Sequence, residues 1–160
     1  MSLHRLKELS REDFIIILKF RVEDQFKEWS RTLISAQHFQ RERMRRACGS
    51  IKREAAYYFQ YISECSSEVN SEIAPLILSC FNKLAEDYIK KVTTPLSYQR
   101  ASPMYQTIVN LLLQVMQMPS FSVYNKETFP INLIKQFSIG QIQYLNNITE
   151  LVLPGRSVRD

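Results

Sequence analysis

The side chains that most often do catalytic chemistry are sparse in this chain. It has two histidines, His4 and His38, and three cysteines, Cys48, Cys65 and Cys80. No CxxC or HExxH motif joins them, so they lack the spacing of a zinc site or of a thiol–disulfide couple. We therefore expect reduced thiols, with Cys80 packed in the core, and a surface-exposed His38.

The chain also lacks a glycine-rich phosphate loop and a pair of carboxylates placed for acid–base catalysis. Glycine occurs only at positions 49, 140 and 155, which excludes a glycine-rich loop that cradles phosphates. The adjacent acidic pairs Glu23-Asp24 and Glu86-Asp87 lie in predicted helices, where neighbouring side chains point in different directions. The residues thus predict a protein that is not an enzyme and has no cofactor, no metal site and no small-molecule substrate. An enzyme with an unrecognised site is the least favoured alternative.

A strongly basic stretch lies in the first third of the chain. Residues 41–54 contain six basic and two acidic side chains, and so hold most of the net charge of +5. One interpretation is a surface that binds nucleic-acid phosphates or an acidic partner. The other is a solvated helix end, favourable at a helix C-terminus and countered by the glutamates at 64, 68 and 72. The basic residues are Arg41, Arg43, Arg45, Arg46, Lys52 and Arg53.

The C-terminal part of the chain is poor in charge. Between residues 92 and 153 only Arg100, Lys126, Glu127, Lys135 and Glu150 are ionisable acids or bases. The predicted helix over 103–118 is apolar on most faces, with a thin stripe of amides, and is either the central helix of a bundle or an interface. The last helix is the better candidate for a partner-binding face, because Lys and Glu are depleted at interface cores. Its apolar side carries Ile134, Ile142, Leu145 and Val152.

Helical periodicity and capping signals define the elements. Ser10 and Asp13 resemble a capping box, and apolar residues then recur at steps of three and four from Phe14 to Leu33. This pattern predicts a helix from residue 11 into the forties, with a break at Gly49-Ser50 and a second helix after it. A lead-in containing Leu3, Leu6 and Leu9 comes before the first helix.

Prolines mark the later boundaries. A third helix is expected from about residue 71, with Pro75 near its first turn and an end at 93–95. Ser102-Pro103 predicts the start of a fourth helix that Pro119 ends. A fifth runs from about 130 to 152 and is split in two if Gly140 interrupts it. The fold class is all-α, a single-domain bundle of five to six helices over 1–155, followed by a flexible tail at 156–160.

The overall expectation is a binding protein inside the cell. No signal peptide is recognisable, and the most apolar run, residues 108–118, is too short to span a membrane. We therefore expect an intracellular location, in cytoplasm or nucleus. The favoured function is a non-enzymatic helical adaptor or complex subunit that contacts a protein partner, or a second copy of itself, through the charge-poor C-terminal helices. The alternative is a nucleic-acid-binding protein that uses residues 41–53.

Overall fold

The computed structural model describes residues 3–94 and 98–118, and these are helical without any strand. A short 3-10 helix, η1 (Leu3–Glu8), precedes four α-helices of the described ranges: α1 (Arg11–Ala36), α2 (Arg41–Ser63), α3 (Ser67–Lys91) and α4 (Tyr98–Met116). The expected all-α class is confirmed. The predicted fifth and sixth helices and the tail at 156–160 lie outside the described residues.

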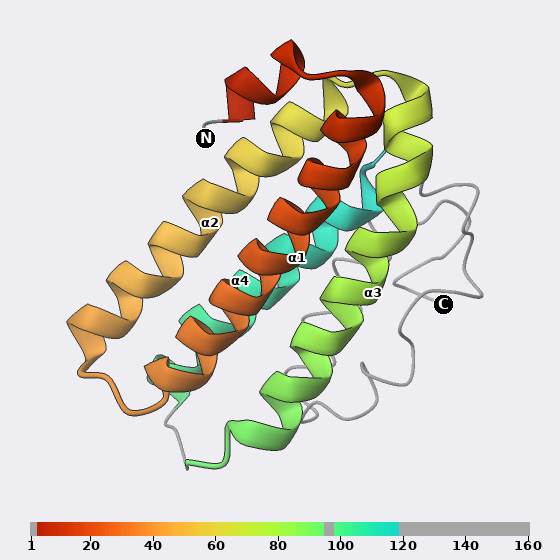
Figure 1. Ribbon diagram of the computed structural model, residues 1–160. Coiled ribbons are helices and arrows are strands. Elements are labelled where there is room, and N and C mark those ends of the chain that lie inside the picture. Colours follow the sequence, from red (N-terminus) through yellow and green to blue (C-terminus); the bar gives the residue numbers. More distant parts are fainter. Residues whose placement is uncertain (1–2, 95–97, 119–160) are drawn as a thin grey trace, which may run out of the picture.

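The helices form an up-and-down bundle joined by short connections (Figure 1). Successive helices run in opposite directions, so that α1 and α3 are parallel to each other and antiparallel to α2. In the view of Figure 1, α1 lies in front between α2 and α3, and α4 lies behind it. The closest packing is of α1 on α3 and of α2 on α4.

The start of α1 follows the expected pattern. The Ser10 side chain accepts a hydrogen bond from the Asp13 backbone amide at 3.3 Å, which satisfies one of the free donors of the first turn. Leu3 and Leu6 of η1 are buried, as the lead-in predicted, and the Tyr61 hydroxyl donates to the Leu3 carbonyl at 2.7 Å. The apolar stripe of α1 is buried throughout: Phe14, Leu18, Val22, Phe26, Trp29, Leu33 and Ala36.

The predicted boundary between the first two helices is wrong. α1 ends at Ala36 instead of in the forties, and α2 runs from Arg41 straight through Gly49. Glycine inside a helix costs about 1 kcal/mol relative to alanine, which a packed helix can absorb without breaking. A Cβ at Gly49 would meet the Arg53 guanidinium at 3.5 Å, an ordinary contact, so close packing does not require glycine there.

The actual turn at residues 37–40 is fixed by the buried side chain of Gln37. Its amide nitrogen donates to the carbonyls of Ile34 and Lys91, each at 2.9 Å. Its amide oxygen accepts from the backbone amides of Thr93 and Thr94, each at 3.0 Å. One side chain thus joins the end of α1 to the end of α3. The chain reverses here because of a tertiary contact and not because of a helix-breaking residue.

Both prolines of the described helices lie deeper than the sequence predicted. Ser66 caps α3 by accepting from the Val69 amide at 3.3 Å, so Pro75 lies in the third turn. α4 begins at Tyr98, so Ser102-Pro103 is inside the helix and not at its start. A proline removes one backbone donor from the helical ladder. Burial of the adjacent Ala74 and Met104 stabilises the helices at these positions.

Most of α4 is buried, including Met104, Ile108, Leu111 and Leu112. Within its amide stripe, Gln106 and Gln117 are exposed, whereas Asn110 and Gln114 are half-buried. This burial favours the interpretation of residues 103–118 as a central helix of the bundle. None of the described helices combines the length and hydropathy needed to cross a bilayer.

Candidate interaction surfaces

The basic side chains of α2 share one side of a single helix. Because the helix continues through Gly49, the steps of four from Arg41 to Arg45 and of seven from Arg45 to Lys52 place these three on one stripe. Arg46 and Arg53, also seven apart, form the adjacent stripe. All are exposed except Lys52, which is half-buried. We call this set the arginine face: Arg41, Arg45, Arg46, Lys52 and Arg53.

The nearest carboxylates scarcely neutralise the arginine face. Glu54 points to the opposite flank of α2, where it accepts from the Trp29 indole nitrogen at 2.9 Å and from the Gln25 amide at 3.3 Å. Glu42 reaches Arg45 only at 4.0 Å, with both side chains exposed. The other four residues of the face make no ion pair with any carboxylate in the described part of the chain. The excess positive charge therefore faces solvent.

Arg43, the remaining basic residue predicted for this site, lies at the edge of the face, one turn before Arg46. Its guanidinium carbon lies 3.9 Å from the centre of the Phe39 ring, within the range of a cation–π contact. Its position on the helix is on the flank of Glu54, away from Arg45 and Lys52. The structure therefore brings together five of the six predicted residues.

The interpretation of the basic stretch as a solvated helix end placed the arginines at the wrong end of a helix, although most of them are exposed to solvent as it expected. The arginines occupy the N-terminal half of α2, not a helix C-terminus, because the turn comes at residues 37–40. Glu64 lies about 27 Å along the helix from Arg46, given a rise of 1.5 Å per residue. Glu68 pairs with Arg11, and Glu72 pairs with Lys19 at 3.3 Å. These three carboxylates leave the arginine face unneutralised.

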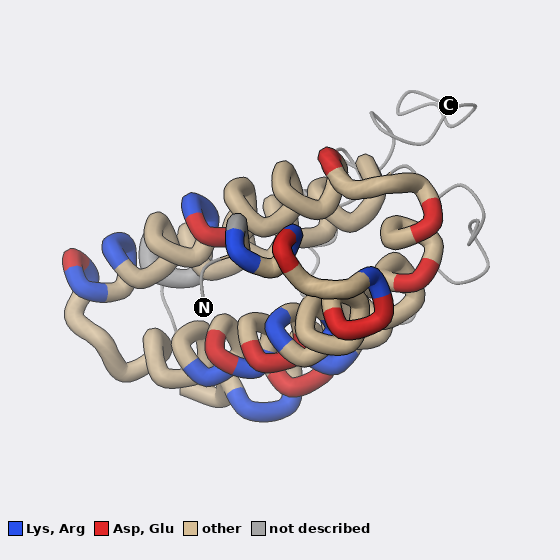
Figure 2. Tube along the Cα trace, turned by 45° about the horizontal axis from the view of Figure 1, so that its top comes forward, with Lys and Arg blue, Asp and Glu red and all other residues tan. Residues whose placement is uncertain are grey.

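Figure 2 shows how unevenly charge is distributed over the bundle. Lys and Arg are concentrated at the beginning of α2, whereas both signs alternate along α1 and α3. Residues 101–116 of α4, which packs beside α2, contain no charged side chain. The helix next to the arginine face thus supplies no counter-charge from that segment.

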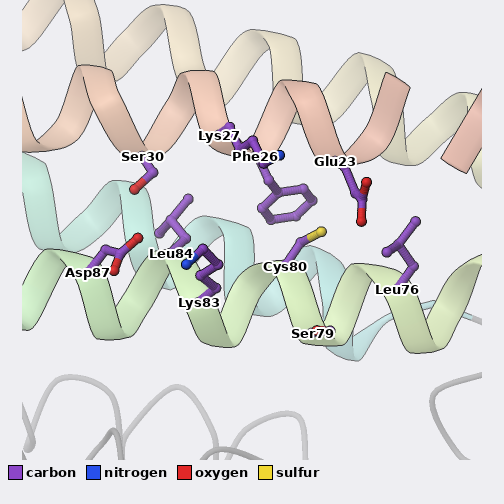
Figure 3. A pocket seen from close by; sticks show the side chains of 10 residues that line it. All are labelled: Glu23, Phe26, Lys27, Ser30, Leu76, Ser79, Cys80, Lys83, Leu84 and Asp87. Atoms are coloured by element: carbon purple, nitrogen blue, oxygen red, sulfur yellow. The ribbon is translucent and has the colours of Figure 1, made fainter. Parts of the chain in front are cut away.

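A second surface lies between the parallel helices α1 and α3 (Figure 3). It is a groove of about 120 Å³ with Phe26 and Cys80 at its base. Its rims carry one acid and one base from each helix, so the charges balance. These rim residues are Glu23 and Lys27 of α1, and Lys83 and Asp87 of α3.

Two large apolar side chains are exposed beyond the end of this groove. Ile16 is 64% exposed and Phe20 is 67% exposed, although most of the apolar residues of α1 are buried. With Glu23 and Lys27 they follow steps of four, three and four, which places all four on one stripe of α1. We call Ile16 and Phe20 the apolar pair. It continues the α1 rim of the groove toward the start of the helix.

Burial favours the neutral form of all three cysteine thiols by raising their pKa. Burial raises the pKa of the Cys80 thiol to about 11, with the nearby Glu23 carboxylate adding to this effect. Burial also raises the pKa of Cys48 and of Cys65. Cys80 is half-buried and packed against the core, as expected. A thiol with a raised pKa is a poor nucleophile at neutral pH, because the thiolate is the reactive form.

No cluster in the described part of the chain resembles a metal centre. Among residues 3–94 and 98–118, no three His, Cys, Asp or Glu side chains are grouped as metal ligands. His38 is exposed as predicted, although it lies in the turn after α1 and not on that helix. The predicted partner-binding residues Ile134, Ile142, Leu145 and Val152 all lie outside the described residues.

The apolar pair and Gln37 were not predicted as functional or structural sites. The apolar run from Phe14 to Leu18 is longer than one stripe of a helix can bury, and this surplus is the signal that could have identified Ile16. Gln37 has no comparable local signal, because the backbone groups of Lys91, Thr93 and Thr94 that it binds are more than fifty residues away. Comparison of the chain with known protein families, with curated proteins and with solved structures found no match.

Proposed function

We propose that this protein is a non-enzymatic helical adaptor, or a subunit of a larger intracellular complex, that binds another protein. The observation that carries the proposal is the apolar pair. Transferring a large apolar side chain from water into an interface contributes about 1.5–3 kcal/mol. Ile16 and Phe20 leave this contribution unused in the bundle, so a partner that covers both would gain it.

The geometry suits a partner helix. Ile16 and Phe20 are one turn apart, and the groove between α1 and α3 continues the same line. A helix whose apolar stripe packs on the pair and then lies along the groove would place charged residues beside Glu23, Lys27, Lys83 and Asp87. Because these rim charges alternate in sign, a partner with both signs fits better than a uniformly charged one.

The charge-poor C-terminal segment supports a second contact of the same kind. Its apolar residues Ile134, Ile142, Leu145 and Val152 remain the sequence-based proposal for a partner-binding face. A second copy of the chain is the simplest partner to test for this segment.

Two double variants separate these contacts. In Ile16→Asp with Phe20→Asp, binding at the α1 surface should be lost while the helical circular-dichroism signal is retained, because both residues are exposed. Ile142→Asp with Leu145→Asp tests the C-terminal segment. Size-exclusion chromatography with light scattering measures self-association, and quantitative affinity purification of each variant from the native cells measures hetero-association. A monomer that binds the same proteins whether or not it carries either pair of changes would contradict the proposal.

A further inference from the structure

We infer that the arginine face of α2 binds the phosphate backbone of duplex nucleic acid. This inference does not depend on the apolar pair, which is on another helix. The face presents four arginines and one lysine along about 18 Å of helix, given 1.5 Å per residue from Arg41 to Arg53. Guanidinium groups match phosphate oxygens in a bidentate geometry, and they keep their charge at all physiological pH values.

The position of these arginines is unfavourable for the protein alone. Arg41 lies in the first turn of α2, at the positive end of the helix dipole, where acidic residues are preferred. Arg45 and Arg46 follow within the next turn, so like charges are close together. Among the described carboxylates, Glu42 alone offsets part of this charge, at 4.0 Å from Arg45. A polyanion bound on this face would offset the repulsion.

Other anionic partners fit less well. A membrane-bound amphipathic helix inserts an apolar face into the lipid, but the apolar face of α2 is buried in the bundle, with Met44, Cys48 and Ile51 each at most 2% exposed. An acidic protein interface usually has an apolar centre surrounded by polar residues. On the described surface, the only large apolar side chain exposed near the arginines is Tyr57, one turn after Arg53.

The aromatic residues favour duplex over single-stranded nucleic acid. Proteins that bind single strands stack successive bases on several aromatic rings. Here Phe39 packs with Arg43, and Tyr57 packs edge-on with Tyr58 at 6.2 Å between ring centres. One partly exposed ring at the edge of the face is not a stacking platform. Contacts to the phosphates therefore carry the binding, without reading of base sequence.

Fluorescence anisotropy with a labelled 24-base-pair DNA duplex tests this inference. The wild-type chain should bind, and its affinity should fall about 500-fold between 50 and 200 mM salt if five phosphates are neutralised. The variant Arg45→Glu, Arg46→Glu, Arg53→Glu should bind at least 100-fold more weakly at 50 mM salt. The corresponding glutamine variant should lose less affinity for the duplex, because it removes the charges without reversing them.

The matched control is Arg5→Glu, Lys7→Glu, Lys90→Glu. It changes the net charge by the same amount at exposed positions of η1 and α3, and should retain affinity within about threefold to tenfold if the local face dominates over net charge. Thermal unfolding of every variant distinguishes loss of binding from loss of folding. Equal loss in the control, salt-independent binding or no binding at 50 mM salt would overturn the inference.

Four further ligands and one further variant test the identity of the ligand. A duplex RNA of the same length should bind comparably, because the backbone phosphates are the shared feature. Single-stranded DNA, phosphatidylserine vesicles and polyglutamate should each bind more weakly than the duplex. Tyr57→Ala should change duplex affinity by less than threefold. Preference for any of the three weaker ligands, or a large effect of Tyr57→Ala, would contradict recognition of a duplex backbone.

Discussion

The N-terminus of α2 differs from those of α1 and α3 in a way that folding alone does not explain. All three N-cap residues have nearly the same backbone conformation, with φ and ψ of −59° and 156° at Ser10, −63° and 154° at Gln40, and −60° and 155° at Ser66. Ser10 and Ser66 cap their helices, and acidic residues follow in the first turn. Gln40 makes no side-chain bond to the described first turn of α2, where Arg41 and Arg43 outnumber the single acidic residue, Glu42.

The difference shows that the start of a helix can be stabilised either locally or by tertiary contacts. Capping and acidic first turns stabilise α1 and α3 locally. α2 lacks the cap and carries charge of the wrong sign, so it depends on tertiary contacts: the Gln37 bonds at its preceding turn and the burial of Met44 and Cys48. The beginning of α2 therefore costs the bundle stability, and the anion contact proposed above would offset that cost.

The largest expected effect comes from removing the tertiary support. Gln37→Leu leaves the part-buried backbone groups of Lys91, Thr93 and Thr94 without their side-chain partner, and should lower the free energy of unfolding by about 1–3 kcal/mol. Urea denaturation followed by circular dichroism measures this loss. The exposed neighbour serves as control, because His38→Ala should change stability by less than about 0.5 kcal/mol. Equal effects of the two substitutions would refute the role of Gln37.

An intermediate effect is expected from exchanging the caps. Ser66→Ala should destabilise the protein by about 1 kcal/mol, because the Val69 amide loses its partner. Gln40→Ser should stabilise it by a similar amount, because the backbone of residue 40 is already in the capping conformation. Urea denaturation should therefore show changes of opposite sign in the free energy of unfolding of the two variants. A neutral or destabilising Gln40→Ser would show that the start of α2 is limited by something other than its cap.

The smallest effect concerns charge. Arg41→Glu should stabilise the protein by about 0.3–1 kcal/mol at low salt, because a negative charge suits the N-terminus of a helix. The gain should shrink at 1 M salt, where charge interactions are screened. Arg53→Glu, in mid-helix, is the control and should change stability less. If Arg41→Glu destabilises the protein at low salt, the arginines are not placed at the expense of stability.

The fold class and several elements were predictable from local patterns. The stripe from Phe14 to Leu33, the Ser10 cap and the end of the third helix near residue 92 depend on residues close in sequence. The reversal after Ala36 was not predictable, because it depends on Gln37 contacting α3 across more than fifty residues. Moving that one boundary changed the interpretation of the basic stretch, since the same arginines are favourable at a helix C-terminus and unfavourable at an N-terminus.

For the candidate surfaces too, some features were predictable from sequence and others depended on contacts between helices. The identity of the basic residues was evident from sequence. That Glu54 does not neutralise them was not, because its carboxylate is held by Trp29 in a contact between two helices. The exposure of Ile16 and Phe20 likewise depends on which side of α1 packs against α3. Periodicity located the buried stripe of α1 but did not show that two large residues outside it would remain uncovered.

The antiparallel arrangement of α1 and α2 places the two surfaces at opposite ends of the bundle. The apolar pair lies near the beginning of α1, and the arginine face begins where α2 starts, beside the end of α1 (Figure 1). The apolar pair and the arginine face lie on different helices, so the two proposed ligands could bind at the same time. The bundle would then act as a rigid spacer in a ternary complex, and attachment to the first ligand would raise the effective concentration of the protein near the second.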